Sequence, residues 1–132
     1  MIHNAIVTFA SIELENCLTL RLGLDYGGAF QTFGNFALGG EPGTKAGDHI
    51  KQPNWTAEWI VSVLRACDAE SLDKCVGKVI RVERESDKYA AGIKGIGHCV
   101  RDDRWFYPEQ SRKNFEPSRL ILLANTDPTA TV

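Results

Sequence analysis

The feature that most constrains this fold is a leucine at every second position of residues 17 to 26: Leu18, Leu20, Leu22 and Leu24. The residues between them are polar or glycine. Side chains of a strand point alternately to its two faces, so the pattern predicts a strand with one buried and one solvated face. Residues 4 to 13 are rich in β-branched and aromatic types, and Glu15 and Asn16 favour a turn. A β-hairpin is therefore predicted.

The next segments add a third strand and a long loop. Residues 30 to 38 alternate in the same way and carry aromatic side chains on both faces, which predicts a strand. Residues 39 to 53 contain four glycines and two prolines and almost no periodic apolar pattern. We expect a long loop there, and long loops in compact domains are usually functional or disordered.

A helix is predicted from Asn54, a suitable N-cap, to Cys67. Its apolar residues recur at spacings of three and four: Trp55, Trp59, Ile60, Val63, Leu64 and Cys67. This spacing forms one apolar stripe on an amphipathic helix. Residues 78 to 85 and 89 to 100 read as two further strands joined by a turn.

The element order β-β-β-α-β-β predicts an α+β fold, an antiparallel sheet of about five strands with one amphipathic helix packed across it. The chain shows no internal repeat and no second core, so residues 1 to 110 are expected to form one domain. Residues 111 to 132 are expected to form a partly ordered C-terminal tail. Within this tail, the apolar run from Leu120 to Ala124 could add a sixth strand or a short helix.

Composition excludes several classes of partner. Fifteen Lys and Arg residues face 17 Asp and Glu residues, giving a net charge of −2. Proteins that hold nucleic acid by its phosphates usually carry a clear basic excess, so bulk nucleic-acid binding is disfavoured. No apolar stretch approaches the ~20 residues that cross a bilayer, and no secretory signal is evident. We expect a cytosolic protein, with no membrane partner and with its four cysteines reduced.

The main candidate binding segment is the glycine-rich run from Asp25 to Phe36. Glycine lets a ligand approach the backbone, amide side chains offer both a donor and an acceptor, and aromatic rings can stack on a base. The candidate ligand-binding residues in this run are Tyr26, Gly28, Gln31, Phe33, Gly34 and Asn35. The alternative is a glycine turn between two strands whose aromatic residues belong to the core. The run lacks the Lys-Ser/Thr ending and the following helix of a phosphate loop.

Three more candidates lie in the second half of the chain. His98 follows a Gly-Ile-Gly run and could contact a ligand or act as a base. Arg81, together with Arg84, could hold a phosphate or a carboxylate. Trp105 begins a Trp-Phe-Tyr run. The structural alternatives are a hydrogen-bonded histidine, surface ion pairs of the arginines with Asp87, Asp102 and Asp103, and a core tryptophan. No nucleophile–base pair and no metal-ligand spacing is present, so we expect neither catalysis nor a cofactor.

Several of these stretches together resemble a set of small phage and prophage proteins. The residues that carry the resemblance are Tyr26-Gly27-Gly28, Gln31-x-Phe33-Gly34-Asn35-Phe36-x-Leu38, Trp59-Ile60-x-x-Val63-Leu64, Gly77-x-x-Ile80-Arg81-Val82, Ile96-Gly97-His98 and Asp103-x-Trp105-Phe106-x-Pro108. They cover roughly residues 5 to 108. The usual pattern reads Gln-x-Phe-Gly-Gly-Tyr, and Asn35 replaces its second glycine here. The resemblance implies a phage setting, in which small proteins without catalytic motifs often act as counter-defence factors.

Two functional hypotheses follow. In the first, the protein sequesters a small signalling nucleotide, with residues 31 to 36 and His98 lining a pocket and an arginine neutralising the phosphate. In the alternative, it inhibits a host defence protein such as a nuclease complex, as anti-CRISPR proteins do. The first hypothesis expects Gln31, Phe33 and His98 to converge on one concave site, and scattered positions favour the second. An exposed edge strand of the hairpin could also pair two copies into a homo-oligomer.

Overall fold

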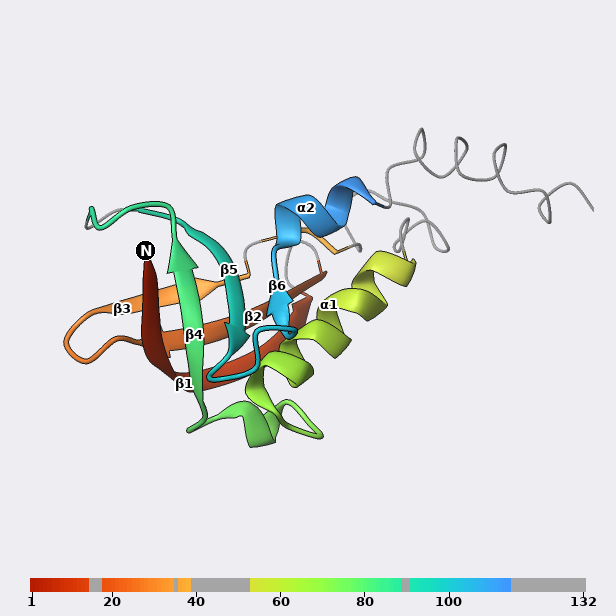
Figure 1. Cartoon of the computed structure of the whole chain (residues 1–132). Helices are drawn as coiled ribbons and strands as arrows, with labels where there is room; N and C mark the ends of the chain where they lie inside the picture. Colours follow the sequence, from red (N-terminus) through yellow and green to blue (C-terminus); the bar gives the residue numbers. More distant parts are fainter. Residues whose placement is uncertain (15–17, 35, 39–52, 89–90, 115–132) are drawn as a thin grey trace, which may run out of the picture.

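The computed structural model describes residues 1–14, 18–34, 36–38, 53–88 and 91–114. Its centre is one antiparallel sheet of six strands in the order β3-β2-β1-β4-β5-β6, with the main helix α1 against one face (Figure 1). The elements are β1 (Ile2–Leu14), β2 (Leu18–Asp25), β3 (Phe30–Phe33), α1 (Pro53–Cys67), η1 (Asp73–Cys75), β4 (Val79–Arg84), β5 (Ile93–His98), β6 (Trp105–Phe106) and α2 (Pro108–Lys113). The predicted α+β fold is confirmed.

The core forms where the leucine-bearing strand and the tryptophan-bearing helix share one side of the sheet. Leu20, Leu22 and Leu24 are fully buried, and Leu18 is half-buried at the end of β2. Trp59 of α1 is also fully buried among them. Both periodicities predicted from the sequence are confirmed, and α1 begins at Pro53, one residue before the predicted N-cap. None of the helices within the described ranges is long and apolar enough to cross a membrane.

The third strand is shorter than predicted. Strand β3 ends at Phe33 because Gly34 has a φ of 109°, in the left-handed region, which turns the chain out of the strand. The chain returns to the sheet at Leu38, whose N–H donates to the carbonyl of Leu18 over 2.8 Å. Two further predictions, the loop from 39 to 53 and the apolar run from 120 to 124, lie outside the described residues except for Pro53.

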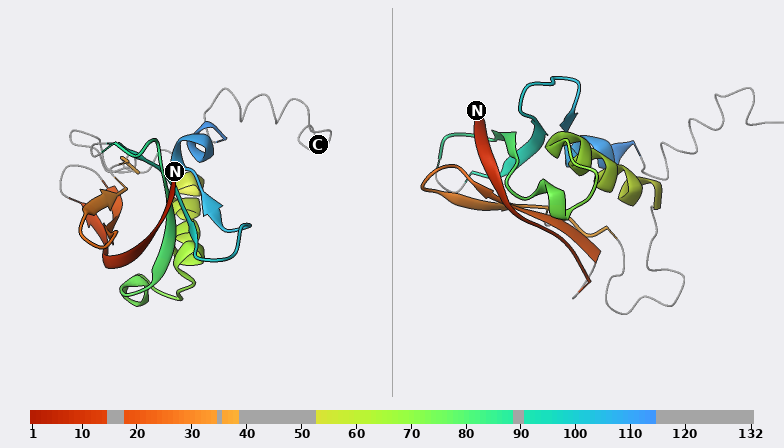
Figure 2. Two further views of the ribbon diagram at one scale, coloured as in Figure 1. Left: turned by 60° about the vertical axis from the view of Figure 1, so that its left-hand side comes forward. Right: turned by 90° about the horizontal axis from the view of Figure 1, so that it is seen from below.

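Two short elements after β5 were not predicted. Strand β6 adds a sixth strand to the expected five through the pairs Ile96↔Phe106 and Gly97↔Trp105. Helix α2 begins with Pro108 and spans the residue at which the expected domain ended. It is tied to α1 by a hydrogen bond from the Trp55 indole to the Ser111 hydroxyl over 3.1 Å. Figure 2 shows both helices from two further directions.

Candidate functional site

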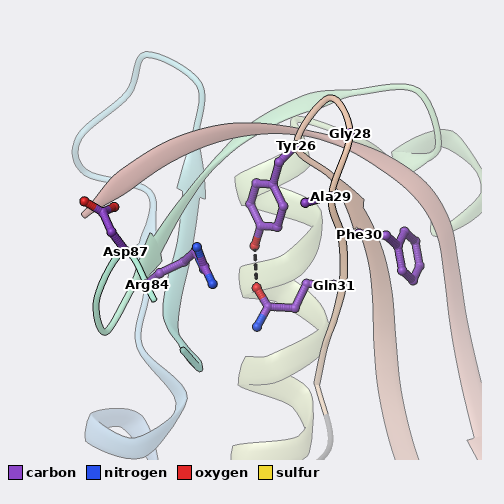
Figure 3. Close-up of a pocket in the computed structure, with 7 residues that line it drawn as sticks. All are labelled: Tyr26, Gly28, Ala29, Phe30, Gln31, Arg84 and Asp87. Carbon is purple, nitrogen blue, oxygen red and sulfur yellow. Dashed lines mark hydrogen bonds between the residues drawn. The ribbon is translucent and has the colours of Figure 1, made fainter. Parts of the chain in front are cut away.

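A cavity of about 600 Å³ lies between the β2–β3 turn and the end of β4 (Figure 3). The residues that line it are Tyr26, Gly28, Ala29, Phe30, Gln31, Arg84 and Asp87. Gln31 pairs with Leu24 and therefore faces the same side of the sheet as the buried leucines. The cavity thus lies on the same face of the sheet as the core, at an end where polar side chains replace the leucines.

The turn that carries the first cavity residues depends on two glycines. Gly27 and Gly28 have φ angles of 86° and 120°, and the N–H of Tyr26 donates to the Ala29 carbonyl over 2.9 Å. A two-residue hairpin turn with positive φ at both central positions strongly prefers glycine at the second of them. The Asp25 carboxylate also accepts from the Gly27 N–H over 2.8 Å. The turn therefore fixes Tyr26 beside the cavity.

Gln31 is held in one orientation by hydrogen bonds at both ends of its amide. Its Oε1 accepts from the Tyr26 hydroxyl over 2.9 Å, and its Nε2 donates to the Ala91 carbonyl over 2.9 Å. Burial raises the pKa of Tyr26 above its usual value, an effect that the positive charge of Arg84 partly offsets. The hydroxyl consequently keeps its proton at neutral pH and remains the donor to Gln31.

Arg84 supplies a positive charge at the cavity. It is half-buried at the end of β4 and its guanidinium points toward Tyr26 and Gln31 (Figure 3). The guanidinium carbon lies 5.8 Å from the centre of the Tyr26 ring, within the range of a cation–π contact. Its Nη2 donates to the Lys88 carbonyl over 2.8 Å, so the β4–β5 connection helps to position the charge.

The remaining walls differ in character. Phe30 borders the cavity, but its ring is 59% exposed and points to the other face of the sheet, where its centre lies 6.3 Å from that of Phe9 (Figure 3). Asp87 is largely exposed on the other side, and its Oδ1 lies 3.7 Å from Nε2 of His3. An anionic group could face Arg84, and Asp87 could accept from a hydroxyl or an amino group. The cavity therefore suits a small polar ligand that carries an anionic group.

Arg81, His98 and Trp105 form a separate cluster at the far end of β5. Arg81 donates from Nε to the His98 carbonyl and from Nη2 to Asp102, each over 2.7 Å. Its guanidinium carbon lies 5.0 Å from the Trp105 ring centre. The indole covers Gly97, where a Cβ would come within 2.5 Å of the ring. These contacts engage all three residues with one another, away from Gln31.

His98 organises the turn that follows β5. The side chain is buried, and its Nδ1 accepts hydrogen bonds from the backbone N–H groups of Val100 and Arg101 over 3.1 and 3.0 Å. A nitrogen that accepts two bonds carries no proton, so the hydrogen of the neutral ring is on Nε2. The contacts of the ring explain its burial without a ligand.

Replacing His98 with alanine is expected to destabilise the protein by about 1–3 kcal/mol, because a buried side chain is removed and two backbone N–H groups lose their acceptor. Urea unfolding followed by circular dichroism measures the change. Val100→Ala is the matched control, since this side chain is 74% exposed in the same turn and the substitution keeps the backbone donors. Equal unfolding midpoints for the two variants would contradict the proposed role of the ring.

The structure divides the nine predicted site residues. Tyr26, Gly28 and Gln31 meet at the cavity, whereas Phe33 is buried and stacks on Trp59 at 5.3 Å between ring centres. Gly34 lies against the Leu20 carbonyl, and Asn35 lies outside the described residues. The expected convergence of Gln31, Phe33 and His98 on one site is therefore not found.

Two charged cavity residues were missed as members of this site. Arg84 was considered only as a companion of Arg81, and Asp87 only as a neighbour of the arginines. A signal for Arg84 was present, because it continues the alternation of the buried Ile80 and Val82 and so points to the same face. A charged residue that continues a buried face at a strand end is a candidate for a polar site.

Comparison of the chain with models of protein families, with curated proteins and with solved structures gives no match. Within the described ranges, no three or more His, Cys, Asp or Glu side chains lie together in a way that could hold a metal ion.

Proposed function

We propose that the protein is a non-enzymatic binding protein that captures a small anionic ligand, a signalling nucleotide, in the cavity between the β2–β3 turn and Arg84. One observation carries the proposal: a positioned guanidinium, a fixed amide and the Tyr26 ring border the same cavity. A binding protein needs no more than this, because affinity comes from complementary contacts on a pre-formed surface.

The dimensions and chemistry of the cavity support a nucleotide. A volume of about 600 Å³ falls within the usual range of small-molecule sites. Phosphate oxygens would lie toward Arg84 on its side away from the neighbouring Asp87, whose carboxylate repels them (Figure 3). The ribose or an exocyclic amino group would then lie toward Asp87.

The resemblance to small phage and prophage proteins supports a biological role for such binding. A protein that sequesters a signalling nucleotide lowers the free concentration of the signal without chemical turnover. In an infected cell this would blunt a nucleotide-activated defence. The proposed role is therefore counter-defence in the host cytosol, with the nucleotide as the physiological ligand.

Isothermal titration against cyclic mononucleotides, cyclic dinucleotides and larger cyclic oligonucleotides tests the proposal. At least one class is expected to bind with a dissociation constant of micromolar order or tighter. Arg84→Gln is expected to weaken that binding by about 10- to 100-fold, since it removes a charge-assisted contact. Arg112→Gln, in an exposed ion pair with Glu109, is the control and should leave affinity unchanged. No binding of any class at ~100 µM would contradict the proposal.

A second candidate function, inhibition of a host protein by direct contact, is favoured by the separation of Phe33 and His98 from Gln31 and by a group of exposed apolar side chains. The sheet face opposite α1 exposes Ile2, Ile6 and Val79 by 56%, 47% and 46%, and Ile6 pairs directly with Val79. Grouped exposed apolar side chains often mark protein-binding surfaces. A host protein retained by the wild type and lost by Ile6→Lys would support this function, whereas nucleotide sequestration requires no protein partner.

A further inference from the structure

Strand β1 extends beyond its neighbour on one side. It pairs with β2 from Ile6 to Leu14 but with β4 only from Ile2 to Ile6, because β4 begins at Val79, opposite Ile6. Figure 1 shows the second half of β1 continuing beside β2 past the start of β4. Figure 2 (right) shows this part of the hairpin projecting away from α1. The second half of β1 therefore has one sheet neighbour and one edge.

Hydrogen bonds near the middle of β1 show where its backbone points before a bulge. The N–H of Val7 donates to the Lys78 carbonyl over 2.9 Å, and the Val7 carbonyl accepts from Gly77 over 2.7 Å. The backbone N–H and C=O of Val7 therefore both point toward β4. The register with β2 shifts between Val7 and Phe9, which is a β-bulge. A bulge adds one residue to the strand. Beyond it, the backbone N–H and C=O groups of the even-numbered residues therefore point to the side of β1 on which β4 lies.

The far end of the hairpin gives the same assignment independently. The carbonyl of Leu18 accepts from the N–H of Leu38, on the side of β2 away from β1. Its partner across the hairpin is Leu14. In an antiparallel pair, the backbone groups of two facing residues either bond to each other or both point away from each other. The backbone N–H and C=O of Leu14 therefore point away from β2. By alternation, Ile12 and Ala10 do the same.

The edge is therefore a row of backbone donors and acceptors at Ala10, Ile12 and Leu14. Among the described residues, no backbone group is hydrogen-bonded to that side of these three. Ile12 and Leu14 are 46% and 69% exposed. Proteins usually protect such an edge with lysine, proline or an inward charge, and residues 10 to 14 read Ala-Ser-Ile-Glu-Leu. The other sheet edges, β3 and β6, are short, with four and two residues.

We infer that this edge pairs antiparallel with the same edge of a second copy, with the twofold axis at Ile12. Backbone groups then meet in hydrogen-bonded pairs, with Ile12 opposite Ile12 and the small Ala10 opposite the large Leu14. On the other face, Ser11 lies opposite Glu13, so the carboxylates avoid one another and each stays 3.2 Å from Arg21 of its own chain. The edge is thus complementary to itself in backbone, size and charge.

Sedimentation velocity at about 10–200 µM protein tests the dimer. The wild type is expected to shift from monomer to dimer over this range, as suits a contact of limited area. Ile12→Lys places two lysines opposite each other and should raise the dimer dissociation constant by on the order of tenfold or more. Ile2→Lys is the control, because Ile2 is similarly exposed on the half of β1 that β4 pairs.

A covalent trap checks the register. Ile12→Cys, with Cys17 and Cys99 replaced by serine, should form a disulfide-linked dimer under mild oxidation by glutathione disulfide. Facing Cα atoms in such a pair lie ~5.5 Å apart, within disulfide reach. Ile2→Cys in the same background should remain monomeric. A wild type that stays monomeric over the whole concentration range would overturn the inference. A dimer that the Ile12→Lys substitution leaves intact would also overturn it, as would binding of this edge to another protein without self-association.

Discussion

Replacing Trp59 with alanine is expected to lower the free energy of unfolding by about 3–5 kcal/mol, the usual loss for a buried aromatic residue. The Trp59 side chain is fully buried, and its ring centre lies 5.3 Å from that of Phe33 and 4.9 Å from that of Phe106. These contacts join α1 to the two opposite edges of the sheet, strands β3 and β6. Chemical denaturation followed by far-ultraviolet circular dichroism measures the loss.

Two further variants make this result interpretable. Val61→Ala, on the same helix and 53% exposed, should change stability by less than about 0.5 kcal/mol. Trp59→Phe should lose less than alanine, because the indole N–H has no hydrogen-bond partner among the described residues and only ring volume is removed. If Trp59→Ala and Val61→Ala unfolded at the same denaturant concentration, the proposed packing of α1 would be wrong.

Gly34→Ala is expected to cost at least about 3 kcal/mol, because backbone strain and a steric clash act together. The φ of Gly34 is 109°, a backbone conformation that residues other than glycine rarely adopt. A Cβ built there would lie 2.0 Å from the carbonyl oxygen of Leu20, which belongs to β2 and cannot move without breaking the sheet. The same denaturation measurement applies.

Gly77 separates the two contributions. Its φ is also positive, at 88°, but no heavy atom lies within 4 Å of the position that a Cβ would occupy. Gly77→Ala should therefore show the backbone strain alone, about 1 kcal/mol. A loss for Gly34→Ala no larger than that for Gly77→Ala would show that the chain after β3 does not approach β2 closely.

Periodicity made the central elements predictable. The leucines of β2 and the stripe of α1 follow repeats of two and 3.6 residues, and each repeat fixes which face is buried without reference to the rest of the chain. Strand β6 has no such repeat, because its two residues are defined by pairing with Ile96 and Gly97. The early end of β3 depends on the approach of Gly34 to Leu20, which sequence spacing does not express.

The candidate site was predictable only in its local part. Tyr26, Gly28 and Gln31 meet because one tight turn joins them, and the Gly27-Gly28 pair predicts that turn. Arg84 lies at the same cavity because the strand order β3-β2-β1-β4 brings the end of β4 near the β2–β3 turn. The hydrogen bond from Gln31 to the Ala91 carbonyl also ties β3 to the β4–β5 connection. His98 belongs elsewhere because it ends β5, whereas Ala91 precedes that strand. Neither relation follows from the spacing of residues along the chain.

Nuclear magnetic resonance titration of the nitrogen-15-labelled protein, with whichever nucleotide class binds most tightly, tests the binding cavity most directly. Saturable shifts are expected for the Gln31 side-chain amide and the Arg84 Nε–H, together with the backbone amides of Gly28 and Ala29. The indole N–H of Trp105 should remain unchanged, because it belongs to the separate cluster with Arg81. Shifts at Trp105 with Gln31 and Arg84 unmoved would contradict the proposed site.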